Sequence, residues 1–226
     1  MKRFKGFSML AVIFILAAAL ITAGCGNKQE EKKEAAGDKE KFKVAFMYVG
    51  PVGDGGYTYA HDQGRQYLVE KMNDVQATIV ESVPDTNAAD PERELTRLAE
   101  EGNKVIFATS FGYMDPTINV AKKYPDVVFM HCSGFKTSEN VGTYFGRMYQ
   151  ARYLTGIVAG KTTQSNLIGY VGAYPIPKVV RGINAFTQGV RSVNPKAKVK
   201  VVWTNTWYDP PRKRKPAKHC LTPAAM

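Results

Sequence analysis

From residue 42 onward, the chain alternates short apolar segments with segments that have helical spacing. The apolar segments are rich in β-branched and aromatic residues, which predicts strands at 42–49, 77–83, 104–110, 126–132, 140–146, 166–172 and 198–205. Two intervening helices are marked by the pairs Asp90-Pro91 and Asp115-Pro116, because aspartate caps a helix and proline is tolerated in its first turn. Apolar strands that alternate with helices form parallel sheets with helices on both faces. The alternation therefore predicts an α/β fold.

The N-terminal residues have the pattern of an export signal. Basic residues precede an uncharged run at 7–23, as in a secretory signal peptide. Small residues stand directly before Cys25, which resembles the bacterial lipobox, where the cysteine is lipidated. We expect a lipoprotein signal peptide at 1–24, with an uncleaved membrane anchor as the alternative. Residues 25–41 are polar and mixed in charge, which predicts a flexible tether outside the cytoplasm.

The net charge of +11 does not indicate a nucleic-acid partner. Most of the excess lies near the two ends of the chain, on Lys2, Arg3, Lys5, Arg212, Lys213, Arg214, Lys215 and Lys218. A nucleic-acid-binding domain needs a basic face on its folded part. We therefore expect no nucleic-acid partner.

The sequence offers no clear set of residues for catalysis or for a metal. Ser133 and His131 alternate on a predicted strand without a third group to complete a triad. The three histidines, with Cys132 and Cys220, are too scattered to ligate a metal. The glycine-rich turn at 50–56 lacks the Gly-Lys-Ser/Thr of a phosphate-binding loop. We expect a protein that is not an enzyme and that uses no metal or cofactor.

Aromatic residues recur in the loops where the predicted strands end, which is where open α/β sheets bind ligands. These loops carry Asp54, Tyr57, Tyr59, Phe111, Tyr113, His131, Phe135, Arg147, Tyr149, Gln150, Tyr174, Trp207, Tyr208 and Asp209. Aromatic walls with a few fixed polar groups suit a flat, polar, mostly uncharged ligand. Asp54 has two roles open, as a hydrogen-bond acceptor for the ligand and as a cap for the following helix.

Four motifs occur in one order along the chain: VGDGGYTYAHDQG, FGRMYQARYLTGIVAG, GYVGAYPIPKVVRGINAFTQGV and WTNTWYDP. Together they resemble the basic membrane protein family of solute-binding lipoproteins of ABC importers, whose best-known members are purine nucleoside receptors. The resemblance covers residues 42 to about 211. It implies a type I periplasmic-binding-protein fold, in which two Rossmann-like lobes with parallel sheets, here 42–147 and 148–211, enclose a ligand.

The resemblance also implies which residues contact the ligand, with one aromatic ring from each lobe stacked on a purine. The expected set is Asp54, Tyr57, Thr58, Phe111, Gly112, Tyr113, Tyr174, Trp207, Tyr208 and Asp209. Nucleoside-binding relatives carry an acidic cluster before the helix at 147, where this chain has Arg-Met-Tyr-Gln at 147–150. This difference favours a free purine base such as adenine, with a purine nucleoside as the alternative.

The implied partners are an ABC permease, its ATPase and the membrane, reached through a lipid anchor on the extracytoplasmic face of the cell membrane. A ligand-sensing binding protein for a membrane signalling receptor is an alternative. An α/β enzyme that acts on a nucleobase is a further one.

Residues 212–226 are basic at first and lack apolar periodicity. Because members of the family are longer, we expect an incomplete second lobe at 148–211 and an aberrant basic tail at 212–226. A frameshift close to residue 211 would explain the tail, since a one-base shift permits an amphipathic helix there; a genuine basic tail is the alternative. An incomplete lobe leaves a strand edge and apolar faces uncovered. We therefore expect a product that is unstable, binds weakly or is a truncated chain without function.

Overall fold

The computed structural model of the chain describes residues 40–207, 209, 211 and 214. Residues 40–226 form a unit separate from residues 1–39. The expected signal peptide, Cys25, nearly all of the expected tether, Tyr208 and the expected tail apart from Arg214 lie outside the described residues.

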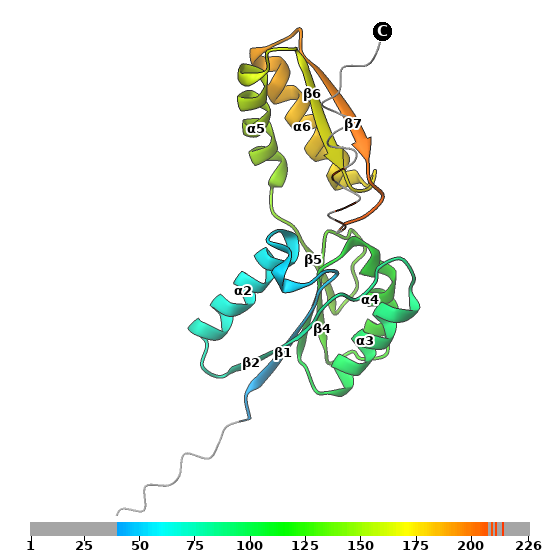
Figure 1. The fold of residues 1–226 in the computed structure, drawn as a ribbon. Helices are drawn as coiled ribbons and strands as arrows, with labels where there is room; N and C mark the ends of the chain where they lie inside the picture. The colour runs from blue at the N-terminus through cyan, green and yellow to red at the C-terminus, as the bar shows by residue number, and fades with distance from the viewer. Residues whose placement is uncertain (1–39, 208, 210, 212–213, 215–226) are drawn as a thin grey trace, which may run out of the picture. The chain divides into compact units, whose positions relative to one another are not determined.

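The first sheet has five parallel strands in the order β2-β1-β3-β4-β5 (Figure 1). The strands are β1 (Phe42–Met47), β2 (Val75–Val80), β3 (Val105–Ala108), β4 (Val128–Cys132) and β5 (Val141–Tyr144). Each corresponds to an apolar segment that the sequence predicts as a strand. The expectation of an α/β fold with parallel strands is confirmed.

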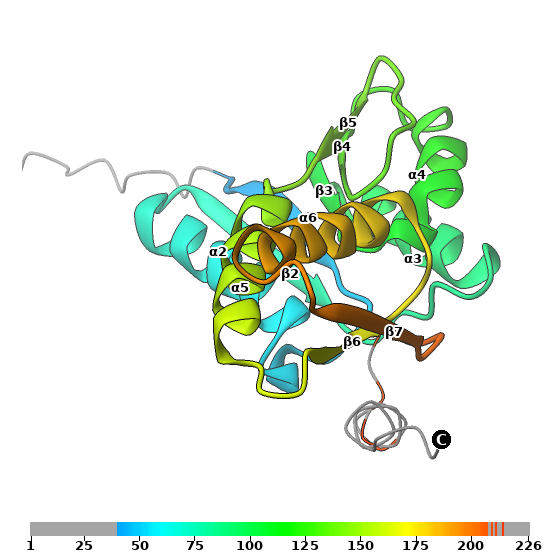
Figure 2. The same ribbon diagram turned by 90° about the horizontal axis from the view of Figure 1, so that it is seen from above.

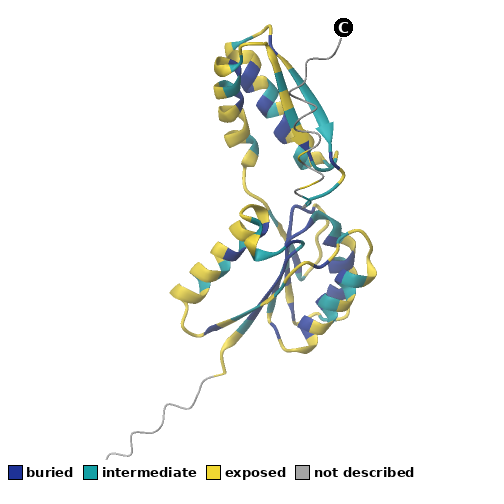
Figure 3. Ribbon diagram, viewed as in Figure 1, coloured by how far each residue is buried: buried dark blue, intermediate teal, exposed yellow. Residues whose placement is uncertain are grey.

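Helices cover both faces of this sheet because its strands are apolar on both faces. The helices are α2 (Tyr57–Lys71), α3 (Ala89–Glu100) and α4 (Met114–Ala121), with short 3₁₀ turns η2 (Val52–Asp54) and η3 (Phe111–Tyr113). Ala45 and Met47 of β1 pack in one cluster with Leu95 of α3 and Val120 of α4. The alternate residues of β1 pack in a second cluster with Leu68 of α2. The strands at the centre are buried, as Figure 3 shows.

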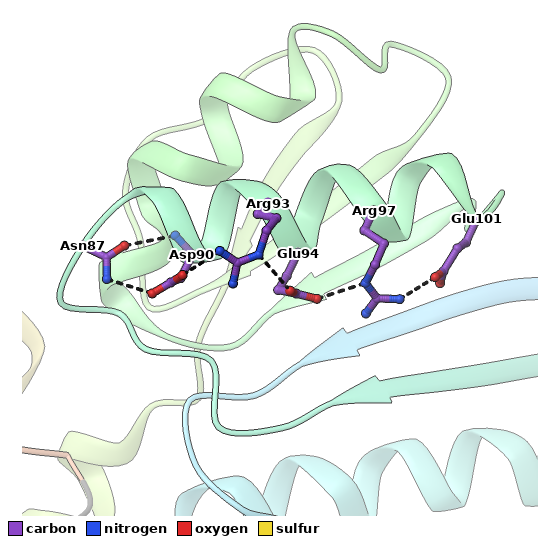
Figure 4. Close-up of polar contacts among 6 residues, drawn as sticks. All are labelled: Asn87, Asp90, Arg93, Glu94, Arg97 and Glu101. Atoms are coloured by element: carbon purple, nitrogen blue, oxygen red, sulfur yellow. Dashed lines mark hydrogen bonds and ion pairs between the residues drawn. The ribbon is translucent and has the colours of Figure 1, made fainter.

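The outer face of α3 carries a row of polar and charged side chains (Figure 4). The row consists of Asn87, Asp90, Arg93, Glu94, Arg97 and Glu101. Exposed ion pairs contribute at most about 1 kcal/mol each, so the row mainly keeps this face solvated. The helix begins at Ala89, and the side-chain Oδ1 of Asn87 accepts a hydrogen bond from the Asp90 backbone N–H at 3.0 Å. Asn87 thus supplies the acceptor that the sequence assigned to Asp90.

The second sheet consists, within the described residues, of two parallel strands, β6 (Leu167–Gly172) and β7 (Lys198–Trp203). Two helices accompany it, α5 (Met148–Thr162) and α6 (Pro177–Val193), which cross in the view of Figure 2 and approach closely at Gly156 and Gly189. Phe186 and Val190 of α6 form a small cluster with Ile168 of β6 and Val199 of β7. One face of this sheet is therefore packed against α6.

Candidate ligand-binding site

The expected ligand-contacting residues that the structure describes lie after the carboxyl ends of the strands. η2 and the start of α2 follow β1, η3 follows β3, Tyr174 follows β6 and Trp207 follows β7. Ligands of open parallel sheets bind at this edge. The side chains at this edge have different roles, which their contacts distinguish.

Asp54 caps helix α2. Its carboxylate accepts hydrogen bonds from the backbone N–H groups of Gly56 (2.8 Å), Thr58 (2.9 Å) and Tyr59 (3.0 Å). Partial burial acts to raise the pKa of Asp54, but these hydrogen bonds outweigh it and hold the pKa below the ordinary value. Of the two roles left open for Asp54, the structure shows the helix cap.

Tyr57 is anchored to the sheet by its hydroxyl. The hydroxyl donates to the Thr109 backbone oxygen at 2.6 Å, and it lies 3.3 Å from the Cys132 sulfur. Burial raises the pKa of the Tyr57 phenol, so the hydroxyl stays a donor. The residue as a whole is nevertheless 43% exposed. The hydroxyl end is therefore fixed over β3 and β4, although the residue keeps exposed surface.

Thr58 and Tyr113 do not reach the surface of this edge. Thr58, the second residue of α2, is buried. Tyr113 is wholly buried in the main core, and its hydroxyl donates to the Val83 backbone oxygen at 2.6 Å. Both were expected to contact a ligand; in this structure both are buried, and Tyr113 links η3 to the loop after β2. Sequence cannot separate Tyr113 from Tyr57, because both are aromatic residues that follow a strand.

Asp85, which the sequence analysis did not single out, joins several loops. Its Oδ2 accepts hydrogen bonds from the Ser110 hydroxyl at 2.5 Å and from the Trp207 indole N–H at 3.0 Å. Gly112 lies against it, because a Cβ at position 112 would come 2.5 Å from the Asp85 backbone oxygen. The sequence carries a signal for it, since Asp85 follows β2 as Asp54 follows β1.

The aromatic residues of the loops after β6 and β7, Tyr174 and Trp207, form a pair. The rings of Tyr174 and Trp207 lie with centroids 5.0 Å apart and planes tilted by 56°. Both side chains are half-buried, as are Phe111 and Asp209. The expected aromatic residues after β6 and β7 are thus brought together.

His131 and Cys132 are buried at the end of β4. The His131 Nε2–H donates to the Ser110 backbone oxygen at 2.7 Å, which leaves Nδ1 buried without a hydrogen-bond partner among the described residues. Burial lowers the pKa of His131, so the ring is neutral near pH 7, and burial raises the pKa of the Cys132 thiol. The Cys132 thiol is therefore held in its protonated form, which is much less reactive than the thiolate. Within the described residues, no cluster of three or more His, Cys, Asp and Glu could hold a metal ion.

A groove of about 620 Å³ lies along α6, beside the loop that follows β6. It is lined by Tyr149, Pro175, Pro177, Val180, Arg181, Asn184, Ala185 and Gln188. None of the expected ligand-contacting residues borders it. The strand-end loops therefore remain the better candidate site, since they combine anchored rings with fixed polar groups.

Comparison with known proteins identifies the family. Residues 41–222 match the sequence model of the Bmp family, described as ABC transporter substrate-binding protein, PnrA-like. The chain belongs to the Bmp family. This confirms the resemblance inferred from the four motifs. The matched region extends to residue 222, beyond the limit of about 211 that the motifs indicated.

Curated relatives of this Bmp-family chain bind different solutes according to their names. The chain is 51% identical to a purine-binding protein of Brucella abortus over 81% of the chain and 52% of that protein. It is 44% identical to a putative ABC transporter glucose-binding protein of Haloferax volcanii, over 87% of the chain and 50% of that protein. A nucleoside-binding protein of Lactococcus lactis is 24% identical over 86% of the chain and 56% of that protein. The chain thus spans about half the length of these relatives.

Solved structures support the fold of the Bmp-family chain. An ABC transporter solute-binding protein from Aeropyrum pernix matches with a TM-score of 0.67 at 21% identity, over 80% of this chain and 52% of that one. An ABC transporter solute-binding protein from Conexibacter woesei matches with a TM-score of 0.60 at 22% identity, over 79% of this chain and 60% of that one. The expected solute-binding-protein architecture is confirmed.

Proposed function

We propose that this Bmp-family chain is the extracytoplasmic substrate-binding component of an ABC importer and that it binds a purine base, with adenine favoured. The observation that carries the proposal is the placement of anchored aromatic rings at the strand ends of both sheets, Tyr57 in the first and the Tyr174–Trp207 pair in the second. Such rings stack on a flat base. The purine-binding relative at 51% identity supports the same ligand class.

The preference for a base over a nucleoside is supported by residues 147–150. These residues, Arg-Met-Tyr-Gln, contain no acid, and ribose hydroxyls are usually recognised by acceptors such as carboxylates. A free base needs no such group. A solute-binding role requires no turnover, so adenine should be recovered unchanged after incubation with the protein.

Calorimetric titration of the purified chain with adenine, adenosine and glucose tests the ligand. We expect adenine to bind more tightly than adenosine and glucose not to bind. Glucose is included because a relative at 44% identity is named as a putative glucose-binding protein. Tighter binding of adenosine would overturn the preference for the base, and binding of glucose alone would overturn the purine proposal.

Substitutions of Tyr57 connect the titration to the site. Loss of a stacking ring costs roughly 1–3 kcal/mol per base in nucleic-acid binders, so Tyr57→Ala should weaken adenine binding about tenfold or more. Tyr57→Phe keeps the ring and should bind more tightly than Tyr57→Ala. Tyr67, a 63% exposed aromatic residue on α2, gives the matched control, and Tyr67→Ala should bind adenine as the unchanged chain does.

The proposal includes a lipid anchor on Cys25 and an ABC permease with its ATPase as partners. The anchor is supported by the apolar run at 7–23 and the small residues before Cys25. None of the helices in the described part of the chain is long and apolar enough to cross a membrane. Incorporation of labelled palmitate that persists in Cys25→Ala would exclude Cys25 as the lipidation site.

A further inference from the structure

We propose that Asp85 is a positioning residue that fixes the orientation of the Trp207 indole for ligand binding. We call the two hydrogen bonds to Asp85 Oδ2, from Ser110 Oγ and Trp207 Nε1, the Asp85 bridge. The proposal rests on the proposed purine-binding function, because it assigns Trp207 a face that stacks on the base.

The Asp85 bridge is chemically suited to hold an indole. The indole N–H of tryptophan only donates hydrogen bonds, and a half-buried Trp usually needs an acceptor for it. A carboxylate accepts such bonds more strongly than a neutral oxygen does. At 3.0 Å, Asp85 Oδ2 lies within hydrogen-bond distance of the Trp207 nitrogen.

Asp85 is itself held in place by residues of the loop after β3. Ser110 donates to its carboxylate, and Tyr113 donates to the backbone oxygen of Val83, two residues earlier. Gly112 leaves room for the Asp85 backbone, which a larger residue would not. Three residues of one segment, Ser110, Gly112 and Tyr113, therefore fix the position of the acceptor.

The Asp85 bridge connects loops from both sheets. Asp85 follows β2, whereas Trp207 follows β7 and is 122 positions away in sequence. The Trp207 ring also lies against Tyr174, tilted by 56°. With its N–H fixed and Tyr174 beside it, the ring loses little conformational freedom when a ligand stacks on it. A preorganised ring binds more tightly than one that must be ordered.

A measurement without ligand tests the orientation of Trp207. The chain contains two tryptophans, so labelling with 5-fluorotryptophan gives two ¹⁹F resonances, and Trp207→Phe assigns them. We expect Asp85→Ala to shift the Trp207 resonance and leave that of Trp203 in place. An unmoved Trp207 resonance would overturn the proposal, and equal movement of both would indicate a general change of fold instead of a positioning role.

Adenine titration of a double-mutant cycle tests the consequence for binding. Loss of a hydrogen bond to a charged group is expected to weaken binding by about tenfold, so Asp85→Ala should show this effect in the chain with Trp207. In the Trp207→Phe background, where the ring lacks the N–H, the same substitution should weaken binding less than about twofold. Equal weakening in both backgrounds would overturn the proposal.

Two further variants complete the design. Asp74 is an exposed acid at the opposite edge of the sheet, before β2, and Asp74→Ala should bind adenine as the unchanged chain does. Asp85→Asn keeps the volume of the side chain and replaces Asp85→Ala in the cycle if Asp85→Ala does not fold. It should weaken adenine binding more in the chain with Trp207 than in the Trp207→Phe background. If the unchanged chain binds no purine, the proposed function fails while the ¹⁹F result still decides the Asp85 bridge. If adenine binds but the cycle shows no coupling, the Asp85 bridge alone fails.

Discussion

Asp54 and Gly55 together shape the turn between β1 and α2. Gly55 has a φ of 59°, in the left-handed region that glycine adopts without strain. This turn brings the Asp54 carboxylate over the first backbone N–H groups of α2, where it accepts three hydrogen bonds. Negative charge is also favourable at a helix N-terminus. The glycine-rich sequence here forms a helix cap, and the neighbouring Tyr57 carries the ring that we propose stacks on the ligand.

Asp54→Ala should destabilise the chain through loss of this cap. We expect the free energy of unfolding at pH 7 to fall by about 1 kcal/mol, as for other helix caps. Because the folded-state pKa of Asp54 lies below its ordinary value of 3.8, the stabilisation is present above that pH and is lost as the pH falls through the folded-state pKa. Urea unfolding at a series of pH values measures the difference between the two proteins.

The matched variant for this prediction is Asp54→Asn, which keeps a side-chain acceptor without the charge. It should retain part of the stability at pH 7 and lack the acid-dependent part. A difference between Asp54→Ala and the unchanged chain that stays constant from pH 7 to below pH 3 would contradict the assigned role of the carboxylate.

At the scale of elements, helices α5 and α6 approach closely through glycines. A Cβ at Gly156 would come 2.1 Å from the backbone oxygen of Phe186, and one at Gly189 would come 2.0 Å from that of Tyr153. Gly156 lies in α5 and Gly189 in α6, so each helix meets the backbone of the other at a glycine. Backbone contact at this distance leaves no space for a side chain.

Gly156→Ala should therefore destabilise the α5–α6 pair. Overpacking typically costs about 1–3 kcal/mol. We expect the free energy of unfolding to fall by an amount within or above this range, because the obstructing atom belongs to the backbone. Gly64 in α2 is the matched control, since it is helical and has nothing within 4 Å of an added Cβ. Gly64→Ala should instead raise the free energy of unfolding by roughly 0.4–1 kcal/mol.

Urea unfolding of the two glycine variants compares them directly. The opposite signs come from the surroundings of each glycine, because both substitutions improve helix propensity equally. Stabilisation by Gly156→Ala would show that the α5–α6 contact is looser than the structure indicates.

At the scale of the whole molecule, the two sheets have cores of different size. The first sheet has helices on both faces and a large cluster of buried residues. The second has a small cluster around Phe186 and Val190, and Leu167 and Val171 on the other face of β6 are more than a third exposed. Buried apolar area is the main source of stability. The second sheet is therefore stabilised by less buried apolar area than the first.

Amide hydrogen exchange should resolve this difference. We expect the amides of β6 and β7 to exchange faster than those of β1, β3 and β4, because local opening costs less where few apolar groups are buried. Exchange by mass spectrometry on the full chain measures both sheets at once. Equal protection of the two sheets would contradict the prediction and would also count against the expected instability of the second lobe.

How far the sequence predicts this protein depends on the range of the interactions involved. The alternation of apolar and helical segments predicted the α/β fold and the position of every strand described here. Hydrophobic periodicity and turn residues specify these elements because they act over a few neighbouring positions of the chain. The four motifs predicted the family. They also placed Tyr57, Tyr174 and Trp207 at strand ends, since a residue that follows a strand stays near its end.

Only the tertiary structure decided what each of these side chains does. Tyr57 and Tyr113 look alike in sequence, yet one is partly exposed and the other is wholly buried. Asp85 and Trp207 meet across 122 positions of sequence, a contact that depends on how loops far apart along the chain are brought together by folding. Local patterns specify elements, whereas burial and hydrogen-bond partners are specified by how those elements pack.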